Sequence, residues 1–121
     1  MFKKALEAIL ERTEGSTGAL IMGTDGIAVE KVLTANGQDL NLDVAAAEFT
    51  ALVRATQRVS SDIGLGALNE LVLSLEGASI VMRLLTQDYF LVLALGRDGN
   101  LGRGRYELRK AELELACEFA V

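Results

Sequence analysis

The chain has 121 residues, half of them apolar, with no proline and a formal net charge of −5 at neutral pH. This length suits one domain with a sizeable core, so we expect a single domain over residues 1–121. The acidic balance, with only two tyrosines and four phenylalanines, disfavours nucleic-acid binding. Because histidine is absent and Cys117 is the only cysteine, histidine-activated nucleophiles, zinc–thiolate clusters and internal disulfides are excluded.

The first residues predict an amphipathic helix that ends by Glu14-Gly15. Glu7 and Glu11 interrupt any apolar stretch of a signal peptide, so we expect a mature helix here. The longest apolar run, residues 89–95, is far short of the roughly 20 residues that cross a bilayer. We therefore expect a cytoplasmic protein without direct membrane insertion. The apolar positions at helical spacing are Phe2, Ala5, Leu6, Ile9 and Leu10.

Two apolar segments, residues 19–23 and 27–33, come next and predict a β-hairpin. Asp25-Gly26 between them supplies the positive φ that a tight hairpin turn requires. Residues 34–41 then predict a loop, because turn-forming residues cluster there.

A long helix is predicted over residues 42–63, with Asn41 as its N-cap. Projection of this segment at the helical period gives one broad apolar stripe, which we expect to face the core. The residues of this expected core stripe are Leu42, Ala45, Ala46, Phe49, Leu52, Val53, Thr56, Val59 and Ile63.

The outward face of this helix is less polar than a solvated face requires. Small side chains four residues apart let another backbone approach closely, and arginine is favoured at protein interfaces. Alanine is also the best helix former, so a docking strip and simple helix propensity both stay open as interpretations. The candidate docking residues are Val44, Ala47, Thr50, Ala51, Arg54 and Arg58, and Ala55 continues the series of small residues.

Three strands are predicted in the following segment, at residues 70–75, 79–85 and 89–95. Glu76-Gly77 and Gln87-Asp88 mark the reversals between them. These connections are too short for parallel crossovers, so the sheet is expected to be mostly antiparallel. In residues 89–95 both alternating sets of side chains are apolar, which predicts a central strand covered by helices on both faces.

The last predicted element is a helix over residues 105–119, preceded by a glycine-rich segment from Gly96 to Gly104. Glycines next to a helix N-terminus are typical of phosphate-binding loops. However, no glycine of the chain precedes lysine, and no glycine set has the i, i+2, i+5 spacing of the dinucleotide-binding fingerprint. We therefore interpret the segment as a turn and a close approach of helix to sheet. Cys117, in an apolar part of this helix, is expected to be buried.

The strand at residues 70–75 directly follows the long helix and is expected at an edge of the sheet. It contains no proline, lysine or bulge signal that would protect an edge from pairing. Such an edge can pair with its own copy in a two-fold dimer, which would place the two long helices side by side. The residues expected at this homodimer interface are Ala55, Glu70, Leu71, Val72, Leu73, Ser74 and Leu75.

Four features in this order and spacing resemble the roadblock/dynein light-chain family, and within it the MglB-like bacterial regulators of Ras-like GTPases. They are the opening "FKKALEAILERTEGSTGALIMGTDG", the turn at Gly23, Asp25 and Gly26, the alanine-rich second helix, and "NLGRGRYELRKA". The resemblance covers all 121 residues. It implies an α+β fold of the roadblock/longin/profilin-like kind, in the order α-β-β-α-β-β-β-α. A five-stranded antiparallel sheet would lie between one long helix and two terminal helices.

The resemblance also implies dimers joined through the third strand and second helix, and a GTPase regulator or scaffold without catalytic residues of its own. No cofactor-binding or metal-binding residues are expected. The leading hypothesis is a homodimeric module that docks a small Ras-like GTPase through the candidate docking residues. An effect on GTP hydrolysis would come from repositioning the switch residues of the GTPase itself. Two alternatives stay open: a dynein-type adaptor, and a small-molecule sensor, which would need a pocket with convergent polar groups.

Overall fold

The computed structural model describes residues 2–35 and 41–119, and its elements follow the order predicted from the sequence. Residues 36–40 of the expected loop lie outside the described part. The expected cap of the long helix is confirmed, because the Val44 N–H donates to Asn41 Oδ1 at 3.3 Å. The elements are α1 (Phe2–Arg12), β1 (Ser16–Gly23), β2 (Ala28–Leu33), α2 (Leu42–Asp62), β3 (Glu70–Ser74), β4 (Ala78–Leu84), β5 (Tyr89–Gly96) and α3 (Leu101–Phe119).

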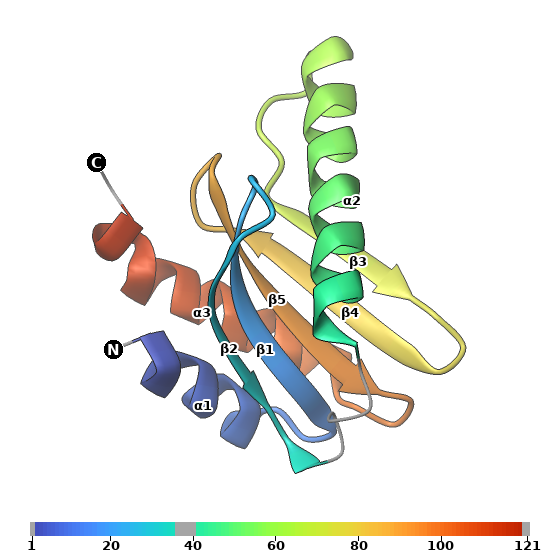
Figure 1. Ribbon diagram of the computed structural model, residues 1–121, viewed down its shortest axis with the longest axis vertical. Coiled ribbons are helices and arrows are strands. Elements are labelled where there is room, and N and C mark those ends of the chain that lie inside the picture. Colours follow the sequence, from blue (N-terminus) through green and yellow to red (C-terminus); the bar gives the residue numbers. More distant parts are fainter. Residues whose placement is uncertain (1, 36–40, 120–121) are drawn as a thin grey trace.

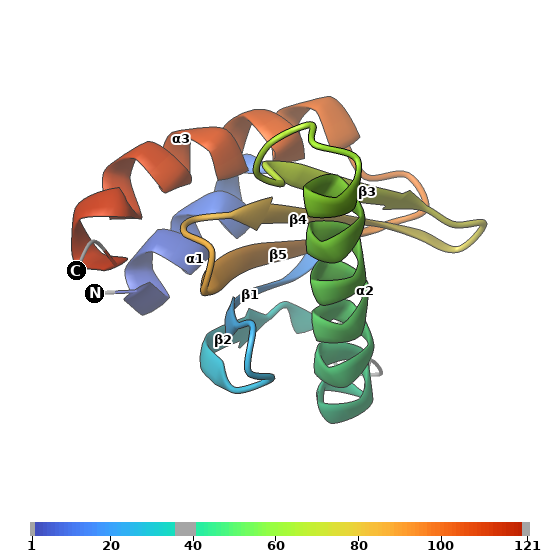
Figure 2. The same ribbon diagram turned by 90° about the horizontal axis from the view of Figure 1, so that it is seen from above.

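The strands form one antiparallel sheet in the order β2-β1-β5-β4-β3, so β5 is central and β3 is an edge, as predicted. Helices α1 and α3 cover one face of the sheet, and α2 crosses the other (Figure 1, Figure 2). Every residue of β5 from Phe90 to Leu95 is buried, because helices cover this strand on both faces. The α+β fold, with its sheet between one long helix and two terminal helices, is therefore confirmed.

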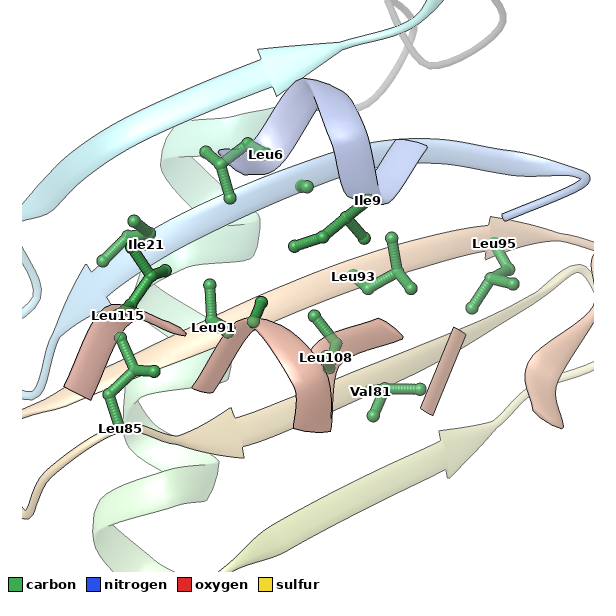
Figure 3. Close-up of a cluster of buried hydrophobic side chains, with 12 residues drawn as sticks. Leu6, Ile9, Ile21, Val81, Leu85, Leu91, Leu93, Leu95, Leu108 and Leu115 are labelled. Atoms are coloured by element: carbon green, nitrogen blue, oxygen red, sulfur yellow. The ribbon is translucent and has the colours of Figure 1, made fainter. Parts of the chain in front are cut away.

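Two apolar cores lie on opposite faces of the sheet, and alternate residues of β5 contribute to both. Figure 3 shows the core beneath α1 and α3, in which Leu91 and Leu93 of β5 cluster with Leu6 and Leu108. The second core lies beneath α2 and comprises Leu20, Met22, Ala46, Phe49, Val53, Ile80, Met82, Leu84, Phe90, Val92 and Ala94.

Glycines before α3 and in its first turn allow this helix to pack close to the sheet. A Cβ atom on Gly104 would lie 2.8 Å from Leu93 Cδ2, and one on Gly99 would lie 2.8 Å from Leu95 Cβ. The interpretation as a turn and a close approach is therefore confirmed.

Helix α3 begins at Leu101, earlier than the predicted start at Arg105. Asn100 caps the helix, because its side-chain oxygen accepts the Arg103 N–H at 3.0 Å. Cys117 is exposed, so the expectation that it is buried is wrong. It lies outside the buried stripe, which consists of Gly104, Glu107, Leu108, Ala111 and Leu115.

The sequence assigns several α2 side chains to the wrong environment. Val59 and Ile63 are exposed rather than part of the core, because the C-terminal end of α2 extends past every strand (Figure 1). Leu52 is also exposed, on a flank of the helix. Thr50 is buried rather than part of an outward rim, and its hydroxyl donates to the Ala46 carbonyl at 2.8 Å. This bond satisfies the hydroxyl within the helix and removes Thr50 from any accessible docking surface.

Candidate docking surface on the second helix and the edge strand

Five of the candidate docking residues are exposed together along α2. Val44, Ala47 and Ala51 supply short side chains, and Arg54 and Arg58 follow them one and two turns later. Residues three or four apart share one side of a helix, so these side chains form a continuous surface. We call it the α2 docking strip. Another backbone could approach its alanine positions closely, because their side chains are single methyl groups.

The basic end of the strip faces the β1–β2 turn. Arg54, Gln57 and Arg58 line a cleft of about 410 Å³ together with Thr24 and Asp25. In the sequence Asp25 has only the signal of a turn residue, and its carboxylate does accept the Ile27 N–H at 3.0 Å. The contribution of Thr24 and Gln57 to this cleft has no local sequence signal, because it depends on how α2 crosses the sheet.

Both arginines of the strip are available to a partner. Within residues 2–35 and 41–119, neither Arg54 nor Arg58 forms an ion pair with a carboxylate. Planar guanidinium groups can bind carboxylates through two parallel hydrogen bonds. The cleft therefore offers two cations to an acidic side chain of another protein, although Asp25 also lines it.

A different flank of α2 is apolar. Leu52, Val59 and Ile63 are exposed, and Ile63 keeps 59% of its surface accessible. Their spacing places them on one side of the helix, and a rotation of about 100° per residue separates them from Arg54 and Arg58. Because the arginines face the β1–β2 turn, this apolar stripe faces the opposite flank, toward β3. We call it the α2 apolar stripe.

The two edges of the sheet differ in how they are protected. The β2 edge carries the charged residues Glu30 and Lys31, and a register shift interrupts its ladder with β1 between Ile21 and Met22. The β3 edge pairs with β4 in unbroken register over Glu70 to Ser74. Charges and bulges discourage strand pairing, so β3 is the edge open to another strand.

Alternation along the β3–β4 ladder leaves every second N–H of β3 free to point outward. The Leu75 N–H donates to the Ala78 carbonyl at 2.8 Å, where the ladder meets the turn. Hydrogen-bonded pairs alternate in antiparallel sheets, so the outward N–H groups belong to Glu70, Val72 and Ser74. Leu75, expected within the strand, lies just beyond its end.

The β3 side chains divide between the two faces of the sheet. Leu71 and Leu73 pack partly buried against the core beneath α2. On the other face Glu70 is paired with Arg83 at 3.6 Å and with Arg105 at 2.7 Å. The Glu70 carboxylate therefore anchors the edge strand to β4 and α3, although sequence reasoning assigned it only to the dimer interface.

The same ion-pair network continues into α3, since Arg83 Nε also donates to Glu112 Oε1 at 2.8 Å. These side chains come from three different elements, so their contact cannot be predicted from a local sequence pattern. The network fixes the position of the edge strand relative to α3.

A larger cleft of about 820 Å³ lies between the C-terminal end of α2 and the β4–β5 turn. Its lining is mainly polar, and its charged members are Asp88 and Glu112. In the described ranges no group of three or more histidine, cysteine, aspartate or glutamate side chains could hold a metal ion. No described helix has the length and apolar character needed to cross a membrane.

Comparisons with known proteins agree with this architecture. The model of the Roadblock/LC7 domain matches residues 3–95. MglC from Myxococcus xanthus is 35% identical, with a TM-score of 0.70, over 98% of this chain and 98% of that protein. The gliding protein MglB from Thermus thermophilus has the same fold, with 22% identity and a TM-score of 0.86 over 95% of this chain and 85% of that protein.

An uncharacterized protein of Methanocaldococcus jannaschii, MJ0714, is 27% identical over 110 residues, which cover 91% of this chain and 90% of that protein. The family match, the identity with MglC over almost the whole chain and the shared fold confirm the resemblance inferred from the sequence. The chain belongs to the Roadblock/LC7 domain family.

Proposed function

We propose that the protein is a non-catalytic, cytoplasmic homodimer that docks a small Ras-like GTPase and acts as its regulator or scaffold. The observation that carries this proposal is the division of α2 into two exposed sides with different chemistry. The α2 apolar stripe faces the open β3 edge, and the α2 docking strip faces away from it. One helix can therefore serve a dimer and a partner at the same time.

The dimer would form by antiparallel pairing of two β3 strands around a two-fold axis. The outward N–H groups of Glu70, Val72 and Ser74 supply donors for this pairing. The C-terminal end of α2 extends past the strands and would cover part of the partner sheet with the α2 apolar stripe (Figure 1). Burial of these exposed side chains would stabilise the dimer. Ala55, half-buried between the two sides of α2, would lie near the paired helices.

The GTPase would bind across the paired helices, on the α2 docking strip of both protomers. Val44, Ala47 and Ala51 would allow close packing, and Arg54 and Arg58 would meet acidic groups of the GTPase. Any stimulation of hydrolysis would arise from repositioning of the switch residues of the GTPase. The relationship to MglB and MglC supports this assignment at the level of the family.

The substitution Ala51→Arg tests the docking strip. The first step is a pull-down with the full chain from its native cell, followed by identification of any small GTPase. Titration calorimetry then measures the affinity of that GTPase, loaded with a non-hydrolysable GTP analogue. We expect Ala51→Arg to remain folded and dimeric while affinity falls at least about tenfold, because the added side chain blocks close packing.

Ala116→Arg is the matched control, since it adds the same side chain at an exposed alanine on the other face of the sheet. It should leave GTPase affinity unchanged. If Ala51→Arg dissociates the dimer, the strip belongs to the dimer interface instead. If this variant stays dimeric and binds the GTPase at full affinity, the docking site lies elsewhere.

A further inference from the structure

The outward face of α3 combines exposed apolar and basic side chains on the side of the sheet opposite α2 (Figure 2). Tyr106 is 57% exposed and Leu113 is 73% exposed. Arg109 is also exposed and lies between them in the sequence. The intervals of three and four residues place all three side chains along one line on the helix, about 10 Å long. We call this line the α3 outer seam.

Basic side chains lie on and beside the seam. The Arg103 guanidinium lies 5.4 Å from the centroid of the Tyr106 ring, within the range of a cation–π interaction. Lys110 is half-buried beside Arg109. In the part of the chain that the structure describes, neither Arg109 nor Lys110 forms an ion pair. Both charges are therefore available to a partner.

The acidic side chains of α3 are buried, paired or on other sides of the helix, so the seam itself is basic. Glu107 is buried, and Glu112 is paired with Arg83 on the side of the sheet. Glu114 and Glu118 are exposed, but at about 100° per residue they lie a quarter turn or more away from the seam. The protein thus presents a local basic surface although its net charge is −5.

We propose that the α3 outer seam docks an acidic amphipathic helix of a partner protein. Alternating intervals of three and four residues are those of helix-on-helix packing, in which side chains of one helix fit between those of the other. Tyr106 and Leu113 supply the apolar contacts at the two ends of the seam. Arg109 at its centre requires a carboxylate on the facing helix, since an unpaired cation would be desolvated on docking.

The charges on this surface favour a protein helix over other occupants. A membrane surface or a nucleic acid is wider than the seam and would also meet the exposed Glu114 and Glu118, whereas a single helix can contact the seam alone. A second copy of the chain is also disfavoured, because two-fold pairing of two seams would bring the two Arg109 side chains together. This proposal does not rest on GTPase docking, which uses the opposite face of the sheet.

Binding of two designed peptides to the full-length protein tests the proposal. Both are helical, span three heptads and share one leucine seam. One carries glutamate at the central and flanking positions, and the other carries lysine there. Fluorescence anisotropy should give a dissociation constant for the acidic peptide that is at least about tenfold lower than for the basic one. Its affinity should fall as salt is raised.

Two substitutions connect binding to the seam. Arg109→Glu should abolish the preference for the acidic peptide, and Leu113→Glu should weaken its binding at least about tenfold. Lys31→Glu and Ile27→Glu introduce the same charge changes at exposed positions of the β1–β2 hairpin and should leave binding unchanged. Circular dichroism should report a folded protein for all four variants, because the altered side chains are exposed.

Several outcomes would overturn the proposal. Three of them are binding results: no measurable anisotropy change with either peptide, equal affinity for both, or full-strength binding of the acidic peptide by Arg109→Glu. Arg109-dependent binding to phosphatidylglycerol vesicles without peptide binding would assign the seam to a membrane. A change in oligomeric state caused by Leu113→Glu would assign it to a second copy.

Discussion

Glu107 is a charged residue placed inside the fold, on the face of α3 that packs toward the sheet. Only 2% of its surface is exposed, and neither carboxylate oxygen has a hydrogen-bond partner among the residues that the structure describes. Its nearest cation is Arg103, with 3.8 Å between Nη2 and Oε1. A buried charge with so little compensation costs stability.

We predict that Glu107→Met stabilises the protein by about 1–3 kcal/mol, because methionine has a similar length and no charge to desolvate. Arg103→Met should instead destabilise it, since the carboxylate would lose its nearest cation. Urea denaturation of both variants measures the two effects. Loss of stability in Glu107→Met would mean that the carboxylate has a partner, such as buried water, which contributes more than its desolvation costs.

Two glycines of α3 provide a matched pair for testing close packing. A Cβ atom at Gly104 would lie 2.8 Å from Leu93 Cδ2, whereas at Gly102 the nearest atom, Asn100 Oδ1, would be 3.7 Å away. We predict that Gly104→Ala destabilises the fold by about 1–3 kcal/mol through overpacking. Gly102→Ala should stabilise it by up to about 1 kcal/mol, because alanine favours the helix. Thermal unfolding of both variants checks the opposite signs, and equal shifts would contradict the close approach.

At the scale of elements, the periodicity of apolar residues predicted the helices and strands, because local sequence determines them. The five strands and the central position of β5 follow from alternation and from short reversals. The positions of α2 side chains do not, because a helical projection gives an angle around the axis but not the place where the sheet ends. Val59 and Ile63 have the period of core residues but are exposed, and the C-terminal end of α2 extends past the strands (Figure 1). Thr50 is polar and was expected at the surface, but its hydroxyl donates a hydrogen bond to the Ala46 carbonyl of the same helix.

The candidate site was predictable only in part for the same reason. Arg54 and Arg58 stand out because basic residues flank small ones on one helix. Their neighbours Thr24 and Asp25 come from a hairpin about 30 residues earlier and meet them only in the folded chain. The pairing of Glu70 with Arg105 likewise depends on how α3 lies against the sheet.

The open edge of β3 gives a prediction about assembly. Val72 has an outward N–H, so Val72→Pro removes a donor from the dimer ladder without breaking the ladder with β4. We expect the unsubstituted protein to sediment at twice its mass of 12.9 kDa at micromolar concentration, and Val72→Pro to sediment as a monomer. Val72→Ala, which retains the N–H, should stay dimeric. A monomeric unsubstituted protein, or a dimeric Val72→Pro, would rule out pairing through β3.

At the scale of the whole molecule, backbone N–H groups of the segment before α3 donate hydrogen bonds to carbonyl groups that follow α1. The N–H of Gly96 donates to the Gly15 carbonyl at 2.9 Å, and that of Asn100 donates to the Glu14 carbonyl at 2.9 Å. Amides bonded in this way are not free to cradle a phosphate. We therefore predict that the isolated protein neither binds nor hydrolyses GTP or ATP, as measured by calorimetry and phosphate release. Micromolar binding that disappears in Arg103→Ala would contradict this prediction.

In the proposed complex, dimerisation affects GTPase binding because both depend on α2. If the GTPase contacts the α2 docking strip of both protomers, a monomer offers only half of the surface. Val72→Pro lies outside the strip and leaves Ala51 and Arg54 unchanged, so its effect on GTPase affinity isolates the contribution of dimerisation. We predict that this variant binds the GTPase at least about tenfold more weakly.

Arg54→Glu should weaken GTPase binding by a different route, with the protein still dimeric. The loss should be larger at low salt than at high salt, because screening reduces the repulsion between the new carboxylate and an acidic partner surface. Calorimetry at two salt concentrations distinguishes this electrostatic effect from the assembly effect of Val72→Pro, which should depend little on salt. Full affinity in monomeric Val72→Pro would mean that one α2 helix is a complete docking site and that dimerisation serves another purpose.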